Sequence, residues 1–354
     1  MRGATRPRTC ALVAAALLVL VTGCGGGQDG AESDDAKSDD AKSDDAGAGE
    51  SPAPDESPAP DDGGGAVNPV IDDDFPDPDL LEVDGTYYAY ATNGNNNNVR
   101  VARSTDLTTW ESLPDALPRL PSFVIPGKTW APEVTQIEPG RFVMYYTATN
   151  FKPTFQCIGV AVAESPEGPF EPVGEAMLIC PPEEGGAIDA STFTDDDGTR
   201  YLLWKNDGNC CGLETWLQMA PLSPDGTALA GDTVRLVQQD LEWEGNLVEA
   251  PTLVKREGTY VLLYSAGDYG GGGYTTGYAT APALTGPYTK SAEPLLSTAM
   301  TADLYLGPGG QDVVVGPDGQ DRLVFHSWYS SFGYRGMNVL PLRWEAGTPA
   351  VVLD

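Results

Sequence analysis

The chain has 354 residues, with 52 acidic side chains against 20 basic ones, and its formal net charge is −32 at pH 7. A surface this acidic argues against nucleic acid and acidic polysaccharides as ligands, because binding either of them needs basic surface. Glycine and proline are frequent between runs of valine, leucine, tyrosine and threonine, and long stretches of helical periodicity are missing, so the sequence predicts an all-β protein.

Residues 1–24 have the pattern of an export signal. Three arginines form a positive head, and residues 11–21 form an apolar run that is too short to span a bilayer. The segment ends in the letters VTGC, which resemble the lipobox of bacterial lipoproteins, where the cysteine is lipidated and becomes the mature N-terminus. The alternative is an ordinary secretory signal with a chance cysteine. We expect a lipid at Cys24 and a location on the extracellular face of the bacterial cell membrane.

Residues 25–66 are predicted to form a disordered stalk. They lack aromatic and large aliphatic side chains and repeat short acidic units such as SDDAK and ESPAPD. Such a segment cannot bury enough apolar area to offset the loss of chain entropy. Thirteen acidic residues against two lysines extend it by mutual repulsion, and its prolines stiffen it.

Residues 67–354 contain five copies of one pattern, in which a short apolar strand leads into a glycine and an aromatic-rich strand follows. The glycines are spaced by 55, 58, 60 and 61 residues, and a third strand follows in each copy. Repeats of this length predict a five-bladed β-propeller with four-stranded antiparallel blades around a central channel. A β-sandwich is the competing fold, but it gives no reason for the repetition. The glycines are Gly85, Gly140, Gly198, Gly258 and Gly319.

Acidic residues recur at nearly one position of this repeat. Innermost strands line the axis of a propeller, so the residues just before them lie at one end of the channel. We therefore expect Asp77, Asp189 and Glu249 to converge on one pocket. Counting nine residues back from each glycine gives Pro76, Ala131, Asp189, Glu249 and Gly310, and Asp77 lies eight back. The innermost strands are expected over residues 78–83, 133–137, 191–194, 251–254 and 312–315.

Three convergent carboxylates suit the hydrolysis of a glycosidic bond with inversion. One ionised carboxylate activates water, and one protonated carboxyl group, roughly 6.5–9.5 Å away, protonates the leaving oxygen. A third carboxylate raises the pKa of the acid by like-charge repulsion. Any one acid taken alone is explained by the abundance of acidic residues. Asp189 and Glu249 differ, because apolar and small residues flank each of them.

Four cysteines follow Cys24, and four cysteines allow three pairings. Cys157 and Cys180 fall in the same repeat, which favours that pair. Cys210 and Cys211 are then either a disulfide between adjacent residues or two free thiols. A catalytic thiol is not expected, because the single histidine, His326, is remote in sequence and lies in a strand pattern.

From residue 68 to its end, the chain resembles glycoside hydrolase family 43, whose members are five-bladed propellers that act on arabinose- and xylose-containing polymers. The matching motifs are FPDPD at 75–79, WAPE at 130–133, IDAS at 188–191 and VEAP at 248–251. The resemblance implies that Asp77 is the general base, with Asp79 as the less favoured claimant. It also implies that Glu249 is the general acid and that Asp189 tunes its pKa.

Other candidate site residues are aromatic or basic. The resemblance places Trp130 in the sugar pocket, and the alternative is a blade interface. Arg335 is the fifth-blade arginine expected to reach the site, with a surface position as the alternative. Trp204, Trp328 and Tyr269 are further candidates for the pocket rim.

One segment departs from the family pattern. Many members carry a Gly-His pair in the fifth blade whose histidine points down the channel, often toward a bound calcium, but here Gly310 stands at that place. The axial calcium is therefore not carried over, and no cofactor is expected to be required. Gln311 binding water or an ion and a channel without metal are the two alternatives, and His326 is expected to be structural.

Together these features predict a monomeric, lipid-anchored glycosidase with a carbohydrate substrate and no nucleic-acid partner. We expect inverting hydrolysis of α-L-arabinofuranosyl or β-D-xylosyl linkages in plant cell-wall polysaccharides or their oligosaccharides. The chain stops just after the fifth repeat, which favours arabinofuranosidase or arabinanase activity over the two-domain β-xylosidases. The alternatives are a non-catalytic sugar-binding propeller and a hydrolase of another glycan such as a β-galactoside. Exo or endo action stays open.

Overall fold

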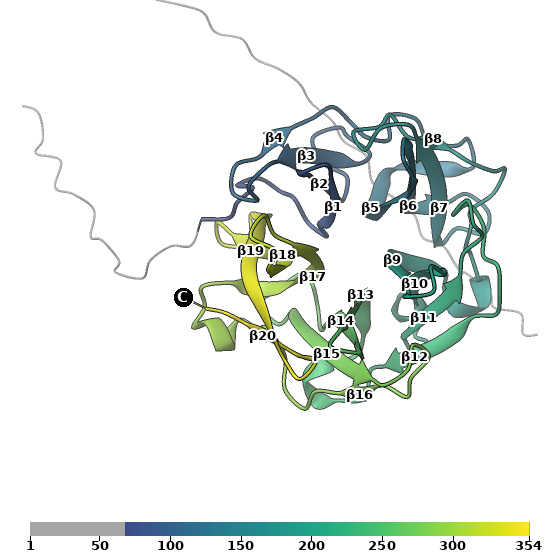
Figure 1. The fold of residues 1–354 in the computed structure, drawn as a ribbon. Helices are drawn as coiled ribbons and strands as arrows, with labels where there is room; N and C mark the ends of the chain where they lie inside the picture. Colours follow the sequence, from purple (N-terminus) through teal and green to yellow (C-terminus); the bar gives the residue numbers. More distant parts are fainter. Residues whose placement is uncertain (1–67, 354) are drawn as a thin grey trace, which may run out of the picture. The chain divides into compact units, whose positions relative to one another are not determined.

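The computed structural model describes residues 68–353, in which five four-stranded antiparallel sheets stand around one axis (Figure 1). This confirms the predicted five-bladed propeller. Cys24 and the predicted signal and stalk lie outside the described residues. The described helices are four short 3-10 turns, and none of them is long and apolar enough to cross a membrane.

Each blade is a meander of consecutive strands, with the first strand innermost (Figure 1). The strands of blades one and two are β1 (Asp79–Val83), β2 (Thr86–Ala91), β3 (Arg100–Ser104), β4 (Glu111–Ser112), β5 (Val124–Glu138), β6 (Arg141–Asn150), β7 (Gln156–Ala163) and β8 (Glu171–Pro172). Blade three contains β9 (Ala187–Thr194), β10 (Arg200–Asn206), β11 (Trp216–Pro221) and β12 (Val234–Gln238). Blades four and five contain β13 (Val248–Arg256), β14 (Thr259–Ala266), β15 (Thr275–Ala281), β16 (Thr289–Lys290), β17 (Leu306–Val315), β18 (Asp321–Tyr329), β19 (Tyr334–Glu345) and β20 (Thr348–Val351). The 3-10 turns are η1 (Pro182–Glu184), η2 (Gly208–Cys211), η3 (Glu242–Glu244) and η4 (Ala299–Thr301).

One hydrophobic cluster fills each of the five blade junctions. Successive side chains of a strand point to opposite faces, and both faces of these sheets are covered. In β6, Val143 and Tyr145 pack toward blade three, whereas Met144 and Tyr146 pack toward blade one. The second strands therefore read as continuous apolar runs in the sequence rather than as an alternating pattern.

The segment before β1 joins the first blade to the last. The amide of Val70 donates to the carbonyl of Met337 at 2.8 Å, and the amide of Phe75 donates to the carbonyl of Arg335 at 2.8 Å. Asp74 accepts the amide of Arg335 at 3.0 Å. These contacts pair the start of the described chain with β19 and so close the ring of blades.

The inner strands bend at one common level. Their ladders shift register there, as between Trp130 and Glu133 in β5 or between Glu249 and Thr252 in β13. Four strands continue on both sides of the shift, so β5, β9, β13 and β17 begin earlier than predicted. The expectation that the acids precede the strands is therefore wrong for Asp189 and Glu249, which lie inside β9 and β13. At this level one residue per blade has a positive φ, and we call these five the bulge residues: Asp77 (54°), Ala131 (38°), Asp189 (56°), Ala250 (49°) and Gly310 (57°).

Two residues beyond the bulge residues, polar side chains of four blades each bind a neighbouring blade, and we call these four side chains the polar ring. Three of them are carboxylates and one is a hydroxyl, and together they link four of the five blade junctions. The contacts are Asp79 accepting the amide of Val134 at 2.8 Å, Glu133 accepting the amide of Thr192 at 2.8 Å, Thr252 donating to the carbonyl of Gln311 at 2.8 Å, and Asp312 accepting the amide of Leu80 at 2.9 Å.

This polar ring makes stability depend on pH. Burial and then the charge of Glu133 raise the pKa of Asp312 from 3.8 to about 7, against two backbone hydrogen bonds that lower it. The folded protein therefore holds a proton that the unfolded chain releases at lower pH, and stability falls as the pH rises from about 4 to 7. We expect Asp312→Asn to reduce the loss of unfolding free energy between pH 5 and pH 8. Denaturant unfolding at pH 5 and pH 8 measures this loss of unfolding free energy. Asp232→Asn, at an exposed position, is the control. A loss that is unchanged from wild type in both variants would contradict the prediction.

Candidate active site

The end of the central channel is lined by residues from the innermost strands of all five blades. All five bulge residues lie in this lining, together with Asp79, Glu133 and Asp312 deeper in the channel. The bulges bring the acids of blades one, three and four together. Asp189 accepts the amide of Ala250 at 3.0 Å, which places it directly beside Glu249. The charge of Asp77 raises the pKa of both Asp189 and Glu249, and the charge of Glu249 raises the pKa of Asp189, so the three carboxyl groups lie close together.

The bulges also correct the count of repeat positions. Counting back from the glycines aligns Glu249 with Asp189 and sets Asp77 one residue apart. The positive φ angles instead align Asp77 with Asp189, and the fourth-blade equivalent is Ala250. Glu249 precedes its bulge by one residue. A glutamate there has one more methylene than an aspartate, so it reaches into the site from a different backbone position.

Asp77 is held as a carboxylate. Its Oδ2 accepts a hydrogen bond from the Thr92 hydroxyl at 2.7 Å, and its Oδ1 lies 3.8 Å from Nη1 of Arg335. Burial alone would raise the pKa of Asp77, but the Arg335 charge and the Thr92 hydrogen bond outweigh burial and lower it. Asp77 is therefore equipped to accept a proton rather than to donate one.

His326 lies directly behind Asp77. Its Nδ1 accepts the backbone amide of Asp77 at 3.0 Å, and its ring stacks on Tyr274 at 5.7 Å. Burial lowers the pKa of His326 to about 3, so the ring is neutral. Gly310 gives it room, because a Cβ on this residue would stand 2.6 Å from Nδ1. The sequence set His326 apart from the site, whereas the structure places it against the site from the neighbouring strand.

Glu249 and Asp189 form a buried acidic pair. Burial raises the pKa of Glu249, against Lys205 and a hydrogen bond from Tyr274 that lower it. The Tyr274 hydroxyl donates to Oε1 of Glu249 at 2.9 Å. Burial and the charge of Glu249 raise the pKa of Asp189 well above its usual range. The pair therefore retains a proton at a pH where two solvated carboxyl groups would both be ionised.

Lys205 is the cation of this pair, and its side chain is fully buried. Its Nζ lies 3.4 Å from Oε2 of Glu249 and 3.4 Å from Oδ1 of Asp207. Sequence reasoning missed Lys205, Tyr274 and Thr92. A lysine inside the apolar run LLWKN was the available signal for Lys205, since a buried lysine needs a partner of opposite charge.

An aromatic cluster stands beside Asp77 on the side of blades four and five. The guanidinium of Arg335 lies 5.4 Å from the ring of Tyr269 and 5.6 Å from the ring of Trp328. Trp328 donates to the carbonyl of Tyr269 at 2.8 Å and packs against Phe332. Tyr269 and Phe332 are about half exposed. Such faces are suited to packing against a sugar ring beside the carboxylates.

Of the two other tryptophans predicted near the site, Trp204 lies elsewhere and the role of Trp130 stays a prediction. Trp204 is 2% exposed and packs in the junction of blades two and three, so its assignment to the rim is wrong. Trp130 is half-buried in β5, and it is not part of the channel lining, which the neighbouring Ala131 and Pro132 reach. Trp204 lies in β10, which is the second strand of its blade as β6 is of blade two, and the side chains of second strands face the blade junctions.

The cysteines form two disulfides, Cys157–Cys180 and Cys210–Cys211. The first is the favoured pair within one repeat, and the second is the bridge between adjacent residues. Among the described residues no group of three or more His, Cys, Asp or Glu side chains is arranged to hold a metal ion. The Nδ1 of His326 is already occupied by the Asp77 amide, so this atom does not fit an axial metal.

Comparisons with known proteins point in one direction. The sequence model described as glycosyl hydrolases family 43 matches residues 66–349. A β-D-galactofuranosidase of Aspergillus niger is 29% identical over 277 residues, covering 71% of this chain and 75% of that protein. Extracellular endo-α-(1→5)-L-arabinanase 1 of Bacillus subtilis is 27% identical over 305 residues, covering 81% and 89%. The crystal structure of a thermostable family-43 glycoside hydrolase superposes with a TM-score of 0.70 at 31% identity, covering 79% of this chain and 93% of that chain.

Proposed function

The chain belongs to glycoside hydrolase family 43, and from this premise we propose which bond it breaks and which residues break it. It is a glycosidase with a carbohydrate substrate. We propose that it hydrolyses α-L-arabinofuranosyl or β-D-xylosyl linkages with inversion of the anomeric carbon. Relatives described as an endo-α-(1→5)-L-arabinanase and as a putative β-xylosidase support these two linkages.

The observation that carries the proposal is the contrast between Asp77, which lines the end of the channel, and the buried pair of Asp189 and Glu249 beside it. Asp77 has a lowered pKa, whereas Asp189 and Glu249 have raised ones. Pairs of titratable groups whose environments push their pKa values apart are the mark of an acid and a base with separate roles. A pocket that only binds sugar needs no protonated glutamate.

In the proposed reaction, Asp77 takes a proton from a water molecule as the oxygen of that water attacks the anomeric carbon. Glu249 gives its proton to the glycosidic oxygen as the bond to the anomeric carbon breaks. Arg335 and Thr92 orient Asp77 and keep it ionised. Asp189 shares the one proton that the pair retains, and the hydrogen bond from the amide of Ala250 favours its ionised form, which leaves that proton on Glu249.

A panel of aryl glycosides and debranched arabinan tests the linkage on the full chain. We expect hydrolysis of the α-L-arabinofuranoside or the β-D-xyloside, and proton NMR of the first product should show the inverted anomer. A retained anomer would contradict the roles of Asp77 and Glu249. A folded protein that cleaves nothing in the panel would point to a sugar-binding propeller.

A second linkage is supported by one relative. The Aspergillus niger protein is a β-D-galactofuranosidase, and galactofuranose shares the five-membered ring of arabinofuranose. The aryl β-D-galactofuranoside therefore belongs in the same panel. Cleavage of this substrate alone would replace the pentose proposal and leave the carboxylate roles unchanged.

We also propose that the enzyme is monomeric and is anchored by a lipid at Cys24 to the outer face of the bacterial membrane. The VTGC motif and the acidic stalk of residues 25–66 support this location. Relatives from Bacillus subtilis and Thermotoga petrophila are described as extracellular. Detergent-phase partitioning of the full chain and of Cys24→Ser tests the anchor, which is contradicted if both partition alike.

A further inference from the structure

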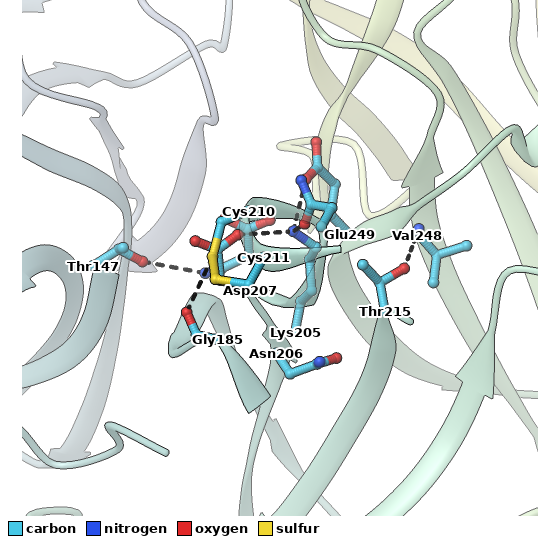
Figure 2. A network of polar contacts seen from close by, with 12 residues as sticks. Thr147, Gly185, Lys205, Asn206, Asp207, Cys210, Cys211, Thr215, Val248 and Glu249 are labelled. Carbon is cyan, nitrogen blue, oxygen red and sulfur yellow. Dashed lines mark hydrogen bonds and ion pairs between the residues drawn. A yellow bond between two sulfur atoms is a disulfide. The ribbon is translucent and has the colours of Figure 1, made fainter. Parts of the chain in front are cut away.

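Lys205 is a shared cation rather than the partner of Glu249 alone. Its shortest contact is with a neutral group, Oδ1 of Asn209, at 2.7 Å. The two carboxylates, Glu249 and Asp207, both lie 3.4 Å away. Figure 2 shows Lys205 between Glu249 and the turn that carries Asp207 and the Cys210–Cys211 bond. A fully buried ammonium depends on such partners, so losing one shifts it toward the others.

Few contacts hold the turn that supplies Asn209 to the rest of the blade: Nδ2 of Asn206 donates to the carbonyl of Glu214 at 3.0 Å, and Sγ of Cys210 lies 3.6 Å from the carbonyl oxygen of Gly185. It consists of η2 and the loop before β11, in which residues 209–214 are exposed. Three backbone hydrogen bonds cross it: Cys210 to Asp207, Gly212 to Gly208 and Leu213 to Gly208. The disulfide joins the two residues that follow Asn209 and closes a ring through their peptide bond. This covalent ring fixes the backbone on the C-terminal side of Asn209.

We propose that the disulfide-closed turn Gly208–Cys211 is a positioning element for the general acid, because it holds Asn209 against Lys205 and thereby sets how closely this cation approaches Glu249. The inference rests on the proposed function. When the disulfide is reduced, the turn loosens and Asn209 leaves Lys205. The ammonium then has only carboxylates as partners and moves toward Glu249.

The chemical step is simple and reversible. Dithiothreitol breaks the S–S bond, each sulfur takes up one electron and one proton, and the reductant becomes its cyclic disulfide. The groups that face Glu249 are Lys205 from β10, Asp189 from β9, Asp77 before β1 and Tyr274 before β15. Only the Lys205 contact changes directly on reduction. A closer cation favours the ionised form of Glu249, which cannot donate a proton.

The test follows the pH dependence of kcat/KM in the full chain before and after reduction. Mass spectrometry after alkylation should find Cys210 and Cys211 unmodified at first and both alkylated after reduction. We expect the alkaline limb of the kcat/KM profile to move to a pH about one unit lower. At pH values above this limb, kcat/KM then falls about tenfold. Asn209→Ala should give the same shift with the disulfide intact. Cys210→Ser/Cys211→Ser should give it without reductant and should not respond to reductant.

Leu213→Ala is the matched control, because Leu213 is exposed in the same loop and its apolar side chain cannot hydrogen-bond to Lys205. A limb that stays fixed in the reduced protein and in Asn209→Ala would overturn the proposal, as would free thiols at Cys210 and Cys211 in the native protein. A separate readout needs no catalysis. The carboxyl carbon of Glu249, observed by NMR in ¹³C-glutamate-labelled protein and assigned with Glu249→Gln, should titrate at lower pH after reduction. An unchanged titration overturns the positioning role even if the panel shows no hydrolysis, whereas a shifted titration without hydrolysis overturns only the proposed function.

Discussion

Glu249→Gln is expected to lower kcat by about 10²–10⁴-fold on natural glycans, the range that general acid catalysis contributes. Glutamine keeps the size of the side chain and an oxygen that can accept from Tyr274, but it has no proton to give to the leaving oxygen. The loss should shrink for aryl glycosides whose phenol is acidic, because a stable phenolate leaves without protonation. Rates on arabinan and on a series of aryl glycosides measure the dependence on the leaving group.

The control for Glu249→Gln is Glu293→Gln, a change of the same chemistry at an exposed position. It should leave kcat unchanged on every substrate. A loss in Glu249→Gln that is equal for acidic and weakly acidic leaving groups would argue against protonation by Glu249. Such a result would fit a change in the position of Lys205 instead, since this cation loses one of its two carboxylates.

The repeat explains why the fold could be predicted. Five glycines in equivalent turns and apolar second strands such as 142–146 recur at nearly constant spacing. Only a ring of similar blades uses that many equivalent units. The first residues of the innermost strands were harder to predict, because the bulges at Ala131, Asp189 and Ala250 interrupt the pairing of a strand without ending it. Proline follows the bulge at Ala131 and at Ala250 but not at Asp189, and alanine rarely adopts a positive φ, so no single residue type marks these three positions.

The three carboxylates could be found from their motifs, but the groups that set their protonation could not. Thr92, Lys205 and Tyr274 come from the connections after the second strands or from their ends. These connections differ in length and composition between blades, so the repeat does not align them. His326 is the clearest example, because its role depends on Gly310 in the neighbouring strand being too small to displace it. Such pairings belong to the assembled blade rather than to any one segment.

The contrast between Asp77 and the Glu249–Asp189 pair arises from unequal placement of two cations. Arg335 lies beside Asp77, where the Thr92 hydroxyl adds to its effect. Lys205 is shared among Asp207, Asn209 and Glu249. Its charge therefore lowers the pKa of Glu249 by less than burial raises it. One fold thereby places an ionised and a protonated carboxyl group at the same channel mouth.

Asp77→Gly is expected to lower kcat by about 10²–10⁴-fold on every substrate, whatever its leaving group, because activation of water is required for each of them. Asp77 has a φ of 54°, a conformation that glycine adopts without strain, so the backbone should keep its path. The space left by the carboxylate should admit a small anion. Added formate is expected to restore part of the activity, and wild type should not respond to it. Initial rates with and without formate measure the rescue.

Asp84→Gly is the matched control, because Asp84 also has a positive φ, 50°, and is exposed in the turn after β1. It should leave kcat unchanged and show no response to formate.

The pH profile gives an independent check. Wild-type activity should persist below pH 4, since the pKa of Asp77 is lowered from its usual 3.8 and the base stays ionised there. An acid limb near pH 6, or a formate effect equal in wild type and Asp77→Gly, would show that another group activates the water. Asp79 would then be the next candidate, but burial and the charges of Glu133 and Asp312 raise its pKa well above the usual range, so it is protonated where Asp77 is not. The same neighbours that keep Asp79 in the polar ring thus exclude it as the base.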